Sequence, residues 1–183
     1  MSAVVILGID PGTASTGLAV VIIEPGLDDQ LAYRAVIRTK KNLAMWRRFC
    51  TIYEAAERLC DEHRPNAIAI EDFIYQGKNI APDAWECRGL VGALQILGRQ
   101  WPIEMRRAFV WKHRISGLPV PRKVQLPGAN KIALDRAVRW AVRARLRISV
   151  PETIHTVDWA DAAGIALVVG DELSLRRSSS KWQ

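Results

Sequence analysis

Four carboxylates stand in apolar surroundings where an unpaired charge is costly. Asp10 ends the apolar run VVILGID, and Glu71 ends the run AIAIE. Asp158 and Asp161 lie three residues apart in TVDWADAAGIALVV, on one face of a predicted helix. Buried carboxylates that converge repel one another unless cations neutralise them. If the four meet, they therefore predict a metal site.

The ligand chemistry narrows the choice of metal. Oxygen-only ligands favour Mg²⁺ or Mn²⁺, and zinc is disfavoured because the only nearby candidate for a nitrogen ligand is His155. Two such ions, about 3.5 to 4 Å apart, stabilise the attacking and leaving oxygens in phosphodiester hydrolysis. The expected cofactor is Mg²⁺, two ions per active site, for which Mn²⁺ can substitute.

Two of these positions have alternatives. Asp72 follows Glu71, and neighbouring strand residues point to opposite faces, so the strand pattern leaves open which of the two enters the site. Asp158 could instead cap its helix, because carboxylates are stabilised at helix N-termini whatever their chemistry. For Asp158 alone capping is the favoured interpretation. Asp161 lies a turn further in, where capping explains less.

Positive charge is concentrated in one segment. The chain has a formal net charge of +7, and residues 106–147 carry 12 Lys or Arg against a single acid, Asp135. The rest of the chain is net negative. Helical spacing places Arg136, Arg139, Arg143 and Arg147 on one stripe, which favours a nucleic-acid partner. A solvated surface helix is the alternative.

The elements that position these groups follow a mixed α/β order. Apolar runs predict strands at Val4–Asp10, Gly17–Glu24, Leu31–Thr39, Asn66–Glu71 and Ile103–Val110. Helical spacing predicts helices at Leu43–His63, Pro82–Arg99, Asn130–Ile148 and Val157–Glu172, and a basic loop at Trp111–Gly128. This order resembles that of ribonuclease H-like domains, with a mixed five-stranded sheet flanked by helices. We expect one nuclease domain over residues 1–175 and a disordered tail over 176–183.

Composition fits one soluble domain. Of 183 residues, 49% are hydrophobic, enough for a core without disulfides. Cys50, Cys60 and Cys87 lack C-x-x-C spacing, which favours reduced thiols over a zinc site. Apolar runs are too short to span a membrane, and no signal peptide is recognisable. We expect a cytoplasmic protein without a membrane partner. Most of the seven tryptophans are expected to serve packing.

Several motifs together resemble the RuvC-type Holliday junction resolvases of the ribonuclease H-like superfamily. They are GIDPGTASTG at 8–17, AIAIED at 67–72, KN at 78–79, RG at 88–89, a lysine opening the penultimate helix, and DWADAAGIAL at 158–167. They follow the family's order across nearly the whole chain. The resemblance implies a Mg²⁺-dependent DNA endonuclease of recombination and repair that resolves four-way junctions by paired symmetric nicks.

The same resemblance assigns roles to residues and partners. It implies a catalytic tetrad of Asp10, Glu71, Asp158 and Asp161, with Lys131 acting at the scissile phosphate. It also implies a homodimer, nucleoid-associated in a cell or in the host cytoplasm if viral, with its seam on the predicted helix at 82–99. An ordinary core helix is the alternative there. The sequence identifies no helicase partner.

DNA-binding residues are expected in three places. The aromatic wedge of the family could be Phe73 or Tyr75, close to Lys78 and Asn79. Basic contacts are expected from the loop and from the helix that follows it, at Lys112, Arg114, Arg122, Lys123, Arg136, Arg139 and Arg143.

Three other functions remain as alternatives. The basic loop looks longer than is usual in the family, so a broader fork and flap nuclease is one, and a branched-DNA-binding module without catalysis is another. An actin-like ATPase ranks last, because that fold needs two halves and 183 residues hold only one.

Overall fold

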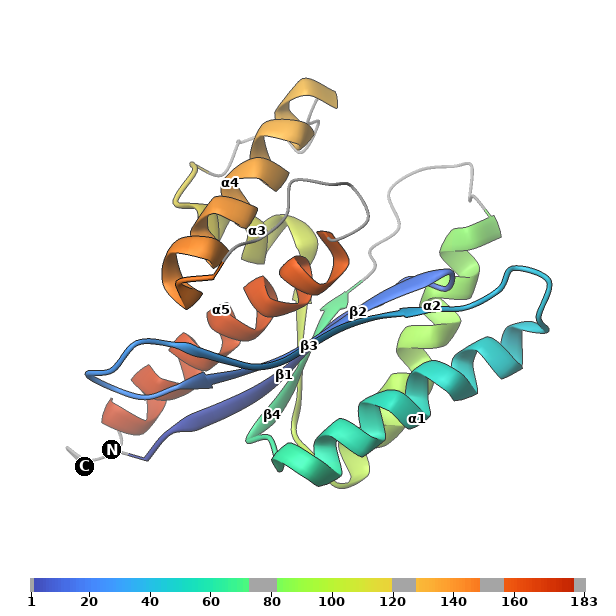
Figure 1. Cartoon of the computed structure of the whole chain (residues 1–183), viewed down its shortest axis with the longest axis horizontal. Coiled ribbons are helices and arrows are strands. Elements are labelled where there is room, and N and C mark those ends of the chain that lie inside the picture. Colours follow the sequence, from blue (N-terminus) through green and yellow to red (C-terminus); the bar gives the residue numbers. More distant parts are fainter. Residues whose placement is uncertain (1, 73–81, 120–127, 149–156, 180–183) are drawn as a thin grey trace.

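A five-stranded mixed sheet forms the middle layer of the protein (Figure 1). The structure is a computed structural model and describes residues 2–72, 82–119, 128–148 and 157–179. The strand order is β3-β2-β1-β4-β5, with antiparallel pairing of β1 to β2 and of β2 to β3, and parallel pairing of β1 to β4 and of β4 to β5. The strands are β1 Val4–Asp10, β2 Ser15–Ile23, β3 Gln30–Arg38, β4 Ala67–Asp72 and β5 Ile103–Arg107.

Helices cover both faces of this sheet. Helices α1 and α2 lie on one face, and α5 lies on the other, with α3 and α4 packed on the outer side of α5 (Figure 1). The helices are α1 Met45–His63, α2 Pro82–Leu94, α3 Ala108–Ser116, α4 Gly128–Leu146 and α5 Val157–Ser179, and a 3₁₀ turn, η1, spans Gln95–Arg99. This arrangement confirms the expected α/β architecture. Within the described ranges, no helix has the length and apolar character needed to cross a bilayer.

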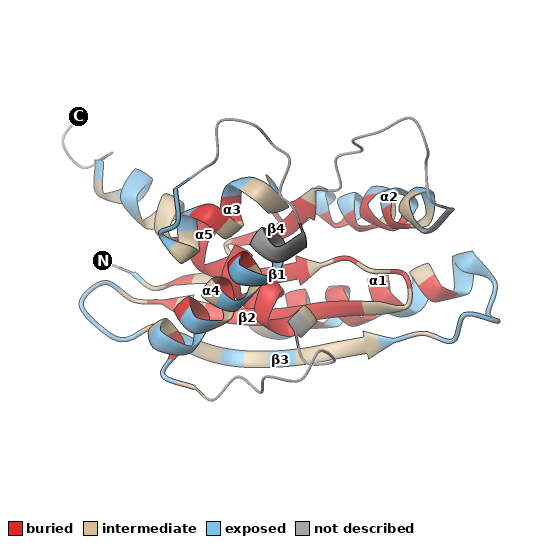
Figure 2. Cartoon of the chain, turned by 90° about the horizontal axis from the view of Figure 1, so that it is seen from above, coloured by how far each residue is buried: buried red, intermediate tan, exposed pale blue. Residues whose placement is uncertain are grey.

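Strand alternation divides the core into two clusters. Ile6, Ala19 and Val21 pack toward α5, whereas Leu7 and Val20 pack toward α1 and α2. Burial colouring shows β1, β2 and β4 buried between the helical layers and much of the edge strand β3 more exposed (Figure 2). Because both faces are buried, the central strands read as continuous apolar runs.

Helix α5 lies unusually close to the sheet. A Cβ atom added to Gly8 would lie 1.9 Å from the carbonyl oxygen of Ala162, and one added to Gly17 would lie 1.9 Å from that of Asp158. Only glycine fits such backbone contacts. These two glycines of the N-terminal motif therefore determine how α5 sits on β1 and β2.

The segment around Trp111 differs from the expectation. The fifth strand ends at Arg107 rather than Val110, and α3 occupies the first part of the predicted basic loop at 111–128. Trp111 is fully buried, and Gly117 ends α3 in the left-handed conformation. Burial of one aromatic side chain against α5 outweighs the loop-like Pro and Gly composition around it.

The ends of two helices also differ from the sequence-based expectations. The predicted helix at 82–99 is α2 followed by the η1 turn, and α5 continues through Ser179, so residues 176–179 are helical rather than a disordered tail. Most tryptophans are expected to pack in the core or at an interface, and of the six described, three are buried in this chain and three are exposed. The buried ones are Trp101, Trp111 and Trp159, and the exposed ones are Trp46, Trp85 and Trp140.

Candidate active site

The parallel pairing of β1 with β4 brings Asp10 and Glu71 to the same edge of the sheet. Ile9 pairs with Ile70, so the carboxylates that follow them leave adjacent strands side by side. Glu71 is 9% exposed. Its charge is among those that raise the pKa of Asp10, after burial, whereas Asp72 falls on the opposite face by strand alternation. The geometry therefore selects Glu71 from the two candidates on β4.

The first turns of α5 bring the other two acids to this edge. Asp158 accepts a hydrogen bond from the Ser15 hydroxyl on β2, which joins its carboxylate to the sheet in addition to any effect at the helix N-terminus. Asp161 is buried, one turn further along α5. The close contact of α5 with Gly8 and Gly17 thus explains how two helix positions reach the ends of two strands.

The four acids form one electrostatic group. Burial raises the pKa of Asp10 well above its usual value, and the charges of Glu71, Asp161 and Asp158 raise it further. Burial also raises the pKa of Glu71 from 4.5 to about 7, with a contribution from Asp161. The pKa of Asp161 is likewise raised, chiefly by burial. Such mutual repulsion is typical of oxygen-rich sites that bind cations.

Lys112 is a positively charged neighbour of the four acids. Its ammonium lies 2.6 Å from Asp161 Oδ2 and 3.3 Å from Asp135 Oδ1. Burial lowers the pKa of Lys112, but the nearby carboxylates of Asp161 and Glu71 outweigh burial and raise it overall. The lysine, predicted to contact DNA from a loop, instead lies on α3 as an internal counter-ion of the acids.

Trp111 holds Glu71 in place beneath this lysine. Its indole Nε1 donates a hydrogen bond of 2.9 Å to Glu71 Oε2, and the Lys112 ammonium lies 5.3 Å from the Trp111 ring centroid. Sequence reasoning missed this pair because both residues were placed in a loop. One available signal was a large aromatic residue isolated within a basic segment, which is typical of a packing anchor.

The donor set fits a hard divalent cation. All four acids offer oxygen, and Asp161 Oδ1 is buried with no hydrogen-bond partner among the described residues. Among the described residues, no three Asp, Glu, His or Cys side chains are already close enough to hold one ion. The Lys112 ammonium contacts one acid and lies close to a second, so a metal ion would compete with it for the same oxygens.

The structure does not test seven of the predicted site residues, because their side chains lie outside its described part. Lys131 lies in the first turns of α4, but its side chain is outside the described part of the structure. Phe73, Tyr75, Lys78, Asn79, Arg122 and Lys123 also lie outside the described residues.

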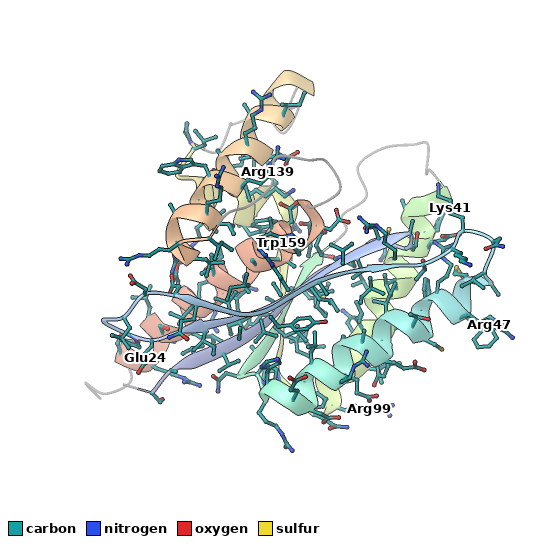
Figure 3. The ribbon with its side chains drawn as sticks, in the orientation of Figure 1. Glu24, Lys41, Arg47, Arg99, Arg139 and Trp159 are labelled. Atoms are coloured by element: carbon teal, nitrogen blue, oxygen red, sulfur yellow. The ribbon has the colours of Figure 1, made fainter. Side chains whose placement is uncertain are left out.

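The basic residues expected to bind DNA separate into two groups. Arg114 contacts Glu172 of α5, and Arg147, beyond the end of α4, pairs with Asp28 at 2.8 Å. The other three remain on α4, where Arg136 and Arg143 are exposed and Arg139 is half-buried. In Figure 3, Arg139 lies on α4 away from the sheet. The predicted stripe of arginines is therefore reduced to three positions.

Comparison with known proteins gives one consistent family. The family model "RuvC: Crossover junction endodeoxyribonuclease RuvC" matches residues 6–169. A protein of that name from Protochlamydia amoebophila is 29% identical over 164 residues, covering 90% of this chain and 89% of the relative. Another, from Thermosipho melanesiensis, is 37% identical over 131 residues, covering 71% and 82%.

Solved structures agree on the fold. Thermus thermophilus RuvC superposes with a TM-score of 0.71 at 22% identity and covers 95% of this chain and 96% of that one. T. thermophilus RuvC in complex with its Holliday junction substrate gives a TM-score of 0.69 at 22% identity, covering 89% and 90%.

Proposed function

The chain belongs to the RuvC family of crossover junction endodeoxyribonucleases, and we propose that it resolves Holliday junctions through the carboxylates of Asp10, Glu71, Asp158 and Asp161. It is a nuclease of the ribonuclease H-like fold. The observation that carries the proposed site is the convergence of acids from β1, β4 and α5, of which Glu71 and Asp161 are buried. Among the described residues, Asp161 Oδ1 has no hydrogen-bond partner although Lys112 contacts the other oxygen of this carboxylate. Carboxylates brought this close together repel one another, which favours binding of further cations.

The cofactor proposed for this site is Mg²⁺, two ions per chain. When bound, the ions would stabilise the attacking and leaving oxygens of the scissile phosphodiester and lower the pKa of the attacking water. The four acids would hold these ions, and Trp111 keeps Glu71 oriented toward the site through its hydrogen bond.

Two lysines, Lys112 and Lys131, are proposed to add positive charge to this site. In the structure the Lys112 ammonium lies 2.6 Å from Asp161 Oδ2 and neutralises that carboxylate. Beside the acids, this ammonium would offer a positive charge to a phosphate oxygen of the substrate. Lys131, by resemblance, acts at the scissile phosphate as well.

Paired nicks in a symmetric junction require two active sites, and we propose a homodimer. The exposed side of α2 and η1 supports a seam there, because Trp85 is 60% exposed and Ile96 is 50% exposed. The helix carries two glycines that would allow close approach of a second copy, Gly89 and Gly92. Gly89 lies against Phe49 of α1 within the same chain, whereas Gly92 has open space beside it and is therefore the better placed at a seam.

Cleavage assays test the function. A four-way junction, a fork, a flap and plain duplex, each end-labelled, are incubated with wild type, Asp10→Asn or Asp72→Asn, in Mg²⁺ or EDTA. We expect paired symmetric nicks in the junction, lost with EDTA and with Asp10→Asn but retained by Asp72→Asn, because Asp72 faces away from the site. Comparable cutting of forks and flaps indicates a broader debranching nuclease, and binding without cutting indicates a binding module.

A further inference from the structure

Helix α4 carries an exposed tryptophan that the active site does not use. Trp140 is 72% exposed, the largest exposed fraction among the bulky apolar side chains of the described residues. The opposite side of α4 is buried through Leu134, Val138 and Val142, which belong to the core cluster under α5. Trp140 therefore contributes nothing to the packing of its own helix.

Arginines flank this tryptophan along the helix. Arg136 lies one turn before Trp140 and Arg143 nearly one turn after it, which places all three on neighbouring positions of the exposed face. Ile132, also exposed, lies one turn before Arg136. The face thus combines one large aromatic surface with positive charge on both sides.

The charges on this face are available to a ligand. Within the described part of the chain, Arg136 and Arg143 form no ion pair, whereas Arg145 pairs with Asp29 and Asp171. Arg147 is similarly occupied by Asp28. The loop between β2 and β3 neutralises the arginines at the end of α4, whereas no acid of the described residues pairs with Arg136 or Arg143 beside Trp140.

We propose that Trp140, Arg136 and Arg143 form a binding site for an unpaired DNA strand, with a base stacked on the indole and phosphates held by the guanidiniums. The proposal rests on the proposed nuclease function and adds a substrate class, branched DNA with a single-stranded segment. Aromatic side chains between basic residues bind single strands because every base has a stacking face. Arginine binds phosphate through bidentate hydrogen bonds.

The position of α4 relative to the acids supports a continuous path. Asp135, on the same helix, lies 3.3 Å from the Lys112 ammonium, which contacts Asp161. Trp140 is five residues further along α4, a rise of about 7.5 Å and a rotation of about 140° around the helix axis. Arg136 lies between the two directions, about 100° from Asp135, so a strand that leaves the carboxylates would pass Arg136 before it reaches Trp140.

Binding measurements separate stacking from charge. We would measure the affinity of the full-length protein, in EDTA so that nothing is cut, for a labelled dT₁₂ oligonucleotide and a duplex of equal length. Trp140→Ala should weaken oligonucleotide binding about tenfold, with duplex affinity nearly unchanged, and Trp140→Phe should restore most of the loss. Ile132→Ala, which removes apolar area without a ring, should have no effect.

Salt dependence gives an independent readout. Trp140→Ala should leave the slope of log K against log[salt] unchanged, whereas Arg136→Ala should reduce it by about one. Equal losses on oligonucleotide and duplex, or no loss from Trp140→Ala, would overturn the site. A lower oligomeric mass for Trp140→Ala in light scattering would overturn it too, since the indole would then contact a second copy of the chain.

The outcomes also distinguish this proposal from the proposed function. If wild type cuts no branched DNA in Mg²⁺ but its oligonucleotide affinity depends on Trp140, the nuclease assignment fails and the strand-binding site stands. If wild type resolves junctions and Trp140→Ala binds and cuts forks with single-stranded arms as wild type does, only the strand-binding site fails.

Discussion

The two faces of the sheet are both covered by helices, but the helices reach the strands in different ways. Helix α5 contacts β1 and β2 backbone to backbone over Gly8 and Gly17. Helix α1 packs instead through larger buried side chains such as Ile52 and Leu59. Both sides bury apolar clusters, and the α5 side in addition holds the acids and their counter-ion Lys112. The close approach of α5 to the strands positions the acids of the site, whereas the side chains that α1 packs against the sheet contribute to stability.

The largest effect should come from removing the buried counter-ion on the α5 side. In Lys112→Met, Asp161 and its neighbours lose their positive partner, and breaking a buried ion pair costs about 3 to 5 kcal/mol. Denaturant unfolding in EDTA at pH 8 should show this loss, and Mg²⁺ should recover part of it. Unchanged stability would mean that the acids are not held by the lysine charge.

Removing apolar packing on the α1 side should affect stability alone. Leu59 is 3% exposed, and Leu59→Ala should cost about 2 to 4 kcal/mol through the cavity it leaves. The rate of junction cleavage, measured well below the melting temperature, should match wild type. A large loss of rate in the folded variant would show that the two faces are not independent.

A methyl group added between α5 and the sheet should lower both the stability of the protein and the rate of cleavage. Gly17→Ala places a Cβ against the carbonyl of Asp158, so overpacking should cost about 1 to 3 kcal/mol. The shift of Asp158 should slow cleavage by about 100-fold. The comparison variant is Leu59→Ala, which should cost a similar amount of stability but leave cleavage unchanged. Equal behaviour of the two variants would contradict the role of close approach.

A further effect concerns pH. The pKa of Glu71 is about 7 when folded and about 4.5 when unfolded, so the stability it contributes is full below pH 4.5 and is lost as the pH rises to about 7. Glu71→Gln, which can still accept the Trp111 hydrogen bond, should therefore be more stable than wild type at pH 8 without metal. Thermal unfolding at pH 4 and pH 8 measures the difference, which should be largely absent at pH 4.

Local sequence patterns predict the strands and the acids at their ends, but not every element of the α5 side. The bounds of β1 and the convergence of its Asp10 with Glu71 follow from apolar runs that end on carboxylates. Helix α3 could not be predicted, because it depends on Trp111 packing against Gly164 of α5, a contact far away in sequence. The role of Lys112 was missed for the same reason. The exposure of Trp140 likewise depends on which side of α4 meets α5.

The most direct test of the account is calorimetric titration of Mn²⁺ into the metal-free protein at pH 8, comparing wild type with Asp161→Asn and with Asp72→Asn as the control. We expect two ions per chain in wild type and in the control, and affinity at least tenfold weaker in Asp161→Asn, since that variant replaces the buried carboxylate whose oxygen has no partner. Wild type that binds no Mn²⁺, or Asp161→Asn that binds it as wild type does, would contradict the claim that α5 brings its acids to the strands to hold metal.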